Sequence, residues 1–224
     1  MLATVIWPER AGGNGTAGEG PDPELSALRA RVDLTGLPPF TRAVTEQVIA
    51  STAEVCYAND LICSEPWLEA AVGALAAGAP VVADGPVVTA GIASEIAICK
   101  AGESLTERLS RSAGIARAAA AVRLAFGAVG PGAIWVVGEE PAAIFEIIAR
   151  SVQPTLVIGM PAGFVAAAAA KRTLSESGLP MMTAAGERGG PVAAAAACRV
   201  LIAASRPAGQ PAEHAGVTGR IRTP

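Results

Sequence analysis

Histidine, aromatic residues and charged residues are all scarce in this chain of 224 residues. The single histidine, His214, lies in the segment GQPAEHAGVTGRIRTP near the C-terminus, so we expect no histidine-based metal site. Aromatic residues make up only 4% of the chain, and no cluster of Lys and Arg is interleaved with them. Together with the net charge of −3, this argues against a surface that binds nucleic acid.

Disulfide and membrane signals are also missing. The cysteines show no Cys-x-x-Cys spacing and lie in apolar runs; they are Cys56, Cys63, Cys99 and Cys198. We therefore expect reduced, buried thiols in a soluble cytoplasmic protein. The start MLATVIWPERAGG has no charged segment followed by a long apolar core, so we expect no signal peptide. Arginines interrupt the longest apolar runs before they reach the roughly 20 residues that span a membrane.

What the chain does have is apolar content, 51% of its residues against 17% charged ones. This composition allows one sizeable core, and the length fits one domain better than two. The stretch AGGNGTAGEGPDP within residues 1–23, and the Pro- and Gly-rich residues 207–224, cannot bury enough apolar area to offset their ordering entropy. We expect a flexible arm and a flexible tail around a folded domain of residues 24–206.

Strand-like apolar runs alternate with helical patterns inside this domain. Strands are predicted over 79–84, 94–101, 133–140, 154–161 and 180–186. Helices are predicted over 40–60, 64–78, 104–127 with a break near Gly114, 141–151, 162–178 and 189–205. Such alternation with short connections indicates a doubly wound α/β fold, in which a mostly parallel sheet carries helices on both faces.

Ligands of such sheets bind outside the carboxyl ends of the strands, where loops lead into helix N-termini. Three glycine-bearing turns come at that place: GEEP (138–141), GMPAGF (159–164) and GERGGP (186–191). Each turn can direct backbone N–H groups at an anion, which predicts a pocket for a ligand with carboxylates or phosphates. Alternatively, the glycines only permit tight turns. No Walker A motif is present. The stretch GGNGTAGEG fits G-x-G-x-x-G over residues 13–18, but it does not follow a strand inside a βαβ unit, so it does not indicate a nucleotide site.

The stretches VIGMPAGFVAAAAAK and GERGGPVAAAAA resemble the precorrin-8X methylmutase family, whose motifs read roughly G-x-P-V-G-F-V-x-A-x-E-S-K and G-x-x-G-G-S. Similar segments (ALAAGAPVVAD, VVTAGI, ARAAAAVRL and VVGEEPAAIFEII) extend the likeness over about 33–205. The resemblance implies a 1,5-sigmatropic methyl shift from C-11 to C-12 of a corrin precursor in cobalamin biosynthesis, without cofactor or metal. It also implies a homodimer that holds the tetrapyrrole near the subunit interface.

The same resemblance implies which residues contact the substrate. These are Arg117, Gly159, Met160, Pro161, Gly163, Phe164, Lys171, Arg188, Gly189 and Gly190. In this interpretation the cations bind the acetate and propionate groups around the macrocycle, and the small residues admit its apolar body. The alternative is that the cations are ordinary surface charges of helices and that the glycines serve the turns alone.

The chain departs from the family at several polar positions. The family's general-acid histidine, in a pattern near I-H-A-T-G-D, aligns with Ala50. The Glu of E-S-K is Ala169, the Ser of G-x-x-G-G-S is Pro191, and the Asn of the first glycine turn is Glu139. Glu54 is a candidate replacement acid because it follows Ala50 by four residues, one helical turn; otherwise it is an exposed helix carboxylate.

Three functions are consistent with these departures. The first is a methylmutase that works without the histidine, because positioning alone accelerates an intramolecular reaction. The second is a divergent relative that binds a corrinoid as a carrier, regulator or partner, which the joint loss of several polar residues favours. The third, another small-molecule enzyme on the same scaffold, lacks any nucleophile–base pair.

Overall fold

The computed structural model describes residues 23–92 and 96–206, which form a six-stranded sheet in the order β1-β6-β5-β4-β2-β3. From β1 to β6 the strands are Leu61–Ile62, Val81–Ala83, Ala97–Cys99, Ile134–Val137, Leu156–Gly159 and Met181–Ala184. Strands β2 to β6 run parallel, and β1 pairs antiparallel with β6 at the edge. The predicted α/β fold with a mostly parallel sheet is therefore confirmed.

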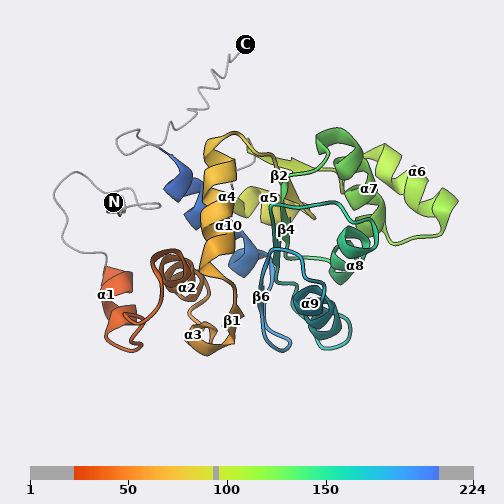
Figure 1. Ribbon diagram of the computed structural model, residues 1–224. Helices are drawn as coiled ribbons and strands as arrows, with labels where there is room; N and C mark the ends of the chain where they lie inside the picture. The colour runs from red at the N-terminus through yellow and green to blue at the C-terminus, as the bar shows by residue number, and fades with distance from the viewer. Residues whose placement is uncertain (1–22, 93–95, 207–224) are drawn as a thin grey trace, which may run out of the picture.

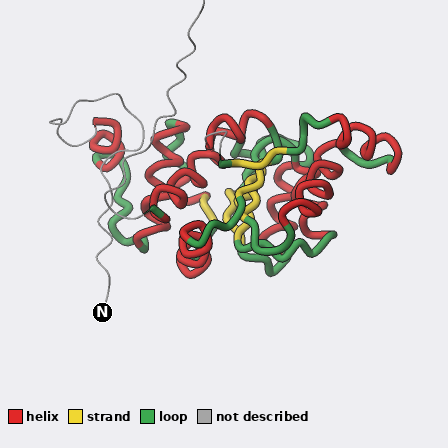
Figure 2. Tube along the Cα trace, turned by 90° about the horizontal axis from the view of Figure 1, so that it is seen from above, coloured by secondary structure: helices red, strands yellow, loops and turns green. Residues whose placement is uncertain are grey.

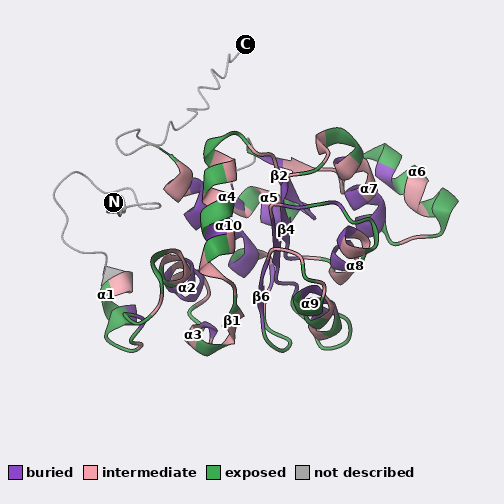
Figure 3. Ribbon diagram, viewed as in Figure 1, coloured by how far each residue is buried: buried purple, intermediate pink, exposed green. Residues whose placement is uncertain are grey.

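Helices cover both faces of this sheet (Figures 1 and 2). They are α1 (Pro23–Arg29), α2 (Pro39–Thr52), α3 (Tyr57–Asp60), α4 (Glu65–Ala76), α5 (Pro86–Ile92), α6 (Ser104–Ala113), α7 (Arg117–Val129), α8 (Pro141–Ala149), α9 (Ala167–Glu176) and α10 (Pro191–Ser205). Buried residues of α2, α4, α5 and α10 form one core with the sheet, and those of α7, α8 and α9 form the other. Helix α6 projects from α7 with most of its surface exposed (Figure 3).

Strand residues alternate between the two cores because successive side chains of a strand point to opposite faces. Ile134 and Val136 belong to the core with α10, whereas Trp135 and Val137 belong to the core with α8. Burial on both faces explains why the strands read as continuous apolar runs rather than as alternating patterns.

In the sheet, β3 lies on one side of β2, and the later strands β4, β5 and β6 follow one another on the other side of β2. The direction of strand addition thus reverses between β2 and β4. In doubly wound sheets, the crevice outside the carboxyl ends of the strands at such a reversal is the usual ligand position. The turn at 138–141 lies at this reversal, while the turns at 159–164 and 186–191 follow β5 and β6.

Several predicted boundaries were wrong. The helix expected over 40–60 is two helices, because Ala53 ends α2 with a left-handed φ of 57° and α3 begins at Tyr57. The helix expected over 162–178 begins only at Ala167, since Gly163, with a φ of 140°, belongs to the preceding turn. The break near Gly114 is confirmed, and α6 and α7 meet there at 117°.

Two further expectations concern the thiols and the chain ends. All four cysteines are free, but only Cys198 is buried; Cys56, Cys63 and Cys99 are half-buried, so the expectation of burial was wrong for these three. The predicted flexible segments lie outside the described residues, except that residue 23 already belongs to α1. Within the described ranges, no single helix is long and apolar enough to cross a membrane, and only the bent pair α6–α7 has that length and composition.

Candidate functional site

The turns that follow β5 and β6 are joined through their backbones. The N–H of Gly190 donates to the Met160 carbonyl at 2.6 Å, and the N–H of Gly163 donates to the Glu187 carbonyl at 2.9 Å. A Cβ atom on Gly189 would overlap the Met160 carbonyl oxygen, and the φ of 152° at this position also favours glycine. The two turns, which sequence analysis singled out separately, therefore form one joint.

Lys171 is a buried cation behind this joint. It projects from α9, is only 3% exposed, and donates from Nζ to the Arg188 carbonyl oxygen. Burial lowers the pKa of Lys171, although the negative charges of Glu187 and Asp60 partly oppose that shift. The ammonium group thus fixes the loop backbone at Arg188, while its predicted contact with substrate stays a prediction.

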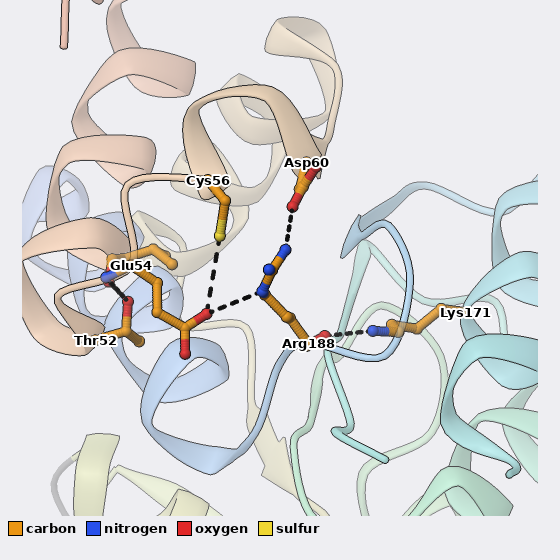
Figure 4. A network of polar contacts seen from close by, with 7 residues as sticks. Thr52, Glu54, Cys56, Asp60, Lys171 and Arg188 are labelled. Carbon is orange, nitrogen blue, oxygen red and sulfur yellow. Dashed lines mark hydrogen bonds and ion pairs between the residues drawn. The ribbon is translucent and has the colours of Figure 1, made fainter. Parts of the chain in front are cut away.

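The Arg188 side chain leaves the joint and meets two carboxylates (Figure 4). Its Nη1 lies 3.2 Å from Asp60 Oδ2 on α3, and its Nε lies 3.7 Å from Glu54 Oε2. Cys56 Sγ is 3.9 Å from the same Glu54 oxygen. This cluster ties the segment between α2 and α3 to the loop between β6 and α10.

Glu54 does not have the geometry that its spacing from Ala50 implied. Helix α2 ends at Thr52, and the left-handed Ala53 turns the chain away before Glu54. The premise that Ala50 and Glu54 share one helical face was therefore wrong. Ala50 itself is half-buried and packs against the core with α10, whereas the Glu54 side chain is 48% exposed.

Tyr57 lies close to this cluster but is fully buried. Its hydroxyl has no hydrogen-bond partner among the described residues. Burial raises the pKa of Tyr57 to about 12, and the negative charge of Glu54 adds to this effect. The phenol is therefore protonated at neutral pH.

At the reversal between β2 and β4, the chain supplies its own anion. Asp84 follows β2 directly, is 7% exposed, and accepts three backbone N–H groups of the turn after β4. Its Oδ1 accepts from Gly138 at 3.1 Å, and its Oδ2 accepts from Glu139 at 2.9 Å and Glu140 at 2.8 Å. The prediction that the turn at 138–141 offers these N–H groups to a ligand is therefore wrong.

Glu139 makes the reciprocal contact from the other loop. Its Oε1 accepts the N–H groups of Val87 at 2.8 Å and Val88 at 3.0 Å, in the first turn of α5. Gly85 makes room for this, because a Cβ atom there would overlap the Glu139 carboxylate. The two carboxylates together lock the loop after β2 to the loop after β4.

The remaining predicted residues are distributed along the carboxyl edge of the sheet. Arg117 begins α7 near the end of β3, where its Nε donates to the Ala101 carbonyl at 2.8 Å, and the structure does not bring it into contact with the joint. Met160 and Pro161 are buried, whereas Phe164 is 91% exposed. Gly159 ends β5 against Ile144 and Leu174.

Sequence analysis missed Asp60, Tyr57 and Asp84. The position of Asp84 immediately after the run VVA is a signal that could have been used, because a polar residue at the carboxyl end of a buried strand faces the ligand edge. Asp60 and Tyr57 carried no such signal, since their place depends on the break in the predicted helix and on Arg188, 128 residues away from Asp60.

Gly189→Ala should lower the free energy of unfolding by roughly 1–3 kcal/mol, because the new methyl group overlaps the Met160 carbonyl and forces the two turns apart. Chemical denaturation measures this change. Gly186→Ala is the matched control: it has a positive φ of 69° in the same loop but open space around its Cβ position. Equal losses in the two variants would contradict the proposed joint.

Burial raises the pKa of Asp84 to about 6, against the three N–H bonds that lower it, and the nearby charge of Glu139 adds to the rise. The folded protein therefore holds this proton more tightly than the unfolded chain, whose Asp pKa is about 3.9. The stabilisation from protonation is present below about pH 4 and is lost as the pH rises through about 6.

We expect the stability of the wild type relative to Asp84→Asn to fall by on the order of 2 kcal/mol between pH 4 and pH 7, because the variant does not titrate. Urea denaturation of both proteins across this range measures the difference. A difference that stays constant with pH, or that grows toward pH 7, would show that Asp84 titrates at its ordinary pKa or below.

Comparison with known proteins identifies the chain. The family model described as precorrin-8X methylmutase matches residues 23–204. The cobalt-precorrin-8 methylmutase of Methanothermobacter thermautotrophicus is 33% identical over 178 residues, which cover 78% of this chain and 85% of that protein. The precorrin-8X methylmutase of Pseudomonas aeruginosa is 31% identical over 189 residues, covering 79% and 90%.

A solved structure supports the same assignment. The precorrin-8X methylmutase from Thermus thermophilus superposes with a TM-score of 0.73 at 28% identity, and the match covers 81% of this chain and 93% of that one. A second solved structure, of a precorrin-8X methylmutase related protein, shares the fold with a TM-score of 0.70 at 24% identity. With the family model matched over nearly the whole described chain and the fold shared with a solved member, this protein belongs to the precorrin-8X methylmutase family.

Proposed function

We propose that this protein binds a carboxylated corrin precursor of the precorrin-8X type at the joint between the turns after β5 and β6. One observation carries the proposal: the two turns that hydrogen bonds join present both an exposed cation, Arg188, and exposed apolar side chains. Phe164 follows Gly163, whose N–H bonds the carbonyl next to Arg188. A flat apolar macrocycle ringed by carboxylates needs both kinds of contact.

Exposed apolar residues continue along this edge of the sheet. Val165 is 93% exposed beside Phe164, Val192 is 52% exposed in the first turn of α10, and Val87 is 52% exposed in the first turn of α5. All of them lie where the parallel strands end. A monomer in water rarely gathers large apolar side chains in this way without a ligand or a partner.

We also propose that binding, rather than fast methyl transfer, is the main property that this chain retains. Its only histidine is His214, which lies outside the described residues, and the position expected for the general acid is Ala50. General acid catalysis contributes about 10²–10⁴-fold to a rate, so a chain without it turns over slowly. The methyl shift is the second candidate, favoured by the intact joint, because positioning alone accelerates an intramolecular step.

Mixing the protein with precorrin-8X, or with its cobalt form, tests both candidates in the visible spectrum. We expect a saturable spectral change without conversion to the hydrogenobyrinic acid product beyond the rate without protein. Conversion above that rate would instead establish a methylmutase that needs no histidine. Absence of any spectral change would overturn the binding proposal.

Ala50→His should increase conversion by about 10²-fold or more if the rest of the site is intact, because it restores a general acid to α2. Ala50→Asn is the matched control, since it adds a polar side chain of comparable reach with no titrating proton. Initial rates of product formation measure the effect, and thermal denaturation checks that both variants fold. Equal rates in both variants would show that α2 does not face the reacting macrocycle.

The proposal includes a cytoplasmic homodimer whose interface covers part of the exposed apolar edge. In this proposal the Phe164 ring lies where the macrocycle and the second subunit meet, so Phe164→Ser should weaken dimerisation of the ligand-free protein by about tenfold or more. Sedimentation equilibrium measures the dissociation constant. Phe145→Ser on α8, where Phe145 is 40% exposed, is the control and should leave the dimer intact. A wild type that stays monomeric at high concentration would contradict the homodimer.

A further inference from the structure

The backbone of Arg188 is fixed, so that only its side chain can respond to a ligand. Lys171 Nζ holds its carbonyl oxygen, and the next two residues pack against the Met160 carbonyl. The Gly190 N–H donates to that carbonyl at 2.6 Å. Any rearrangement at this position therefore takes place in the guanidinium group and in its two counter-ions.

The two carboxylates hold that guanidinium unequally. Asp60 forms a hydrogen bond of 3.2 Å to Nη1 and is 28% exposed. Glu54 approaches Nε only to 3.7 Å, beyond ordinary hydrogen-bond distance, and is 48% exposed. Arg188 is itself 57% exposed, and a guanidinium has five donors, enough to hold Asp60 and a second carboxylate together.

Glu54 can leave this position at little cost. It lies between α2 and α3, beyond the left-handed Ala53, so no helical hydrogen bond is broken when its side chain turns away. Its other side-chain contact is the Cys56 thiol at 3.9 Å. Exposed ion pairs of this kind contribute little to stability, and the released carboxylate regains its hydration.

We propose that Glu54 is a place-holder anion. In the free protein its carboxylate neutralises the Nε edge of Arg188, and in the complex a peripheral carboxylate of the ligand displaces it, while Asp60 keeps Arg188 in place. The inference rests on the proposed function, because the displacing group is a carboxylate of the corrinoid. It makes Glu54 a specificity-determining residue that discourages weakly anionic ligands, rather than a substitute for the missing acid.

Removal of the Glu54 charge distinguishes these two roles, since they predict opposite results. If Glu54 is a place-holder, Glu54→Gln frees the Nε edge of Arg188 and tightens corrinoid binding. If Glu54 is the general acid, the same variant leaves binding unchanged and lowers the rate of methyl transfer. Glu187→Gln is the matched control, because Glu187 is an exposed carboxylate on the same loop that forms no ion pair with Arg188 among the described residues.

Spectral titration with precorrin-8X or its cobalt form provides the test. We expect Glu54→Gln to lower the Kd by about two- to fivefold, more than Glu187→Gln does. Arg188→Ala should raise the Kd by about tenfold or more, because it removes a charge-assisted contact. In the Arg188→Ala background, Glu54→Gln should then have no larger effect than Glu187→Gln, which a double-mutant cycle measures directly.

Three results would contradict the place-holder role of Glu54. Equal effects of Glu54→Gln and Glu187→Gln would reduce the result to a general change of charge and overturn the inference. If Glu54→Gln tightened binding more than Glu187→Gln even without the Arg188 guanidinium, that would also overturn it, as would weaker binding by Glu54→Gln. In all three cases the wild type still binds, so the proposed function stands; a wild type that binds no corrinoid overturns the proposed function itself.

Discussion

The contact between the Met160 carbonyl and the Gly189–Gly190 backbone determines how the carboxyl edge of this protein is built. Two neighbouring parallel strands end in turns that approach so closely that no Cβ atom fits at Gly189. Lys171 donates a hydrogen bond to the Arg188 carbonyl at this joint, and burial of its ammonium group lowers its pKa. The direction and exposure of Arg188, Phe164 and Val165 all depend on this backbone arrangement.

The two candidate anion-binding positions along this edge of the sheet differ. Between β2 and β4, Asp84 and Glu139 satisfy the backbone N–H groups of the opposite loops, so the usual ligand position of a doubly wound sheet is filled by the chain itself. At the joint after β5 and β6, one of the two counter-ions of Arg188, Glu54, is exposed and lies beyond ordinary hydrogen-bond distance. Charge complementarity therefore favours a ligand whose peripheral carboxylates lie at the ends of β5 and β6.

This arrangement separates binding from proton transfer. A methyl shift within one molecule depends on how the macrocycle is held, and in the proposed function the glycine joint, the apolar edge and Arg188 hold it. A general acid is a separate requirement. The Glu54 carboxylate in the cluster is already paired with a cation, and the hydroxyl of Tyr57 close by is buried. A shared scaffold, together with an alanine at the position where the resemblance expects the general acid, is the basis for proposing a corrinoid-binding member of the family.

The amino-acid sequence by itself determined the parallel sheet, because continuous apolar runs such as IWVV and LVIG alternate with helical patterns, which is typical of strands buried on both faces by crossover helices. It also located the glycine turns and, through their motifs, the family. It could not determine that Glu54 lies off the Ala50 face, that Asp84 takes up the N–H groups of the 138–141 turn, or that Arg188 meets Asp60. Those contacts join residues more than 50 positions apart or depend on one left-handed residue, Ala53, so only the tertiary structure decided them.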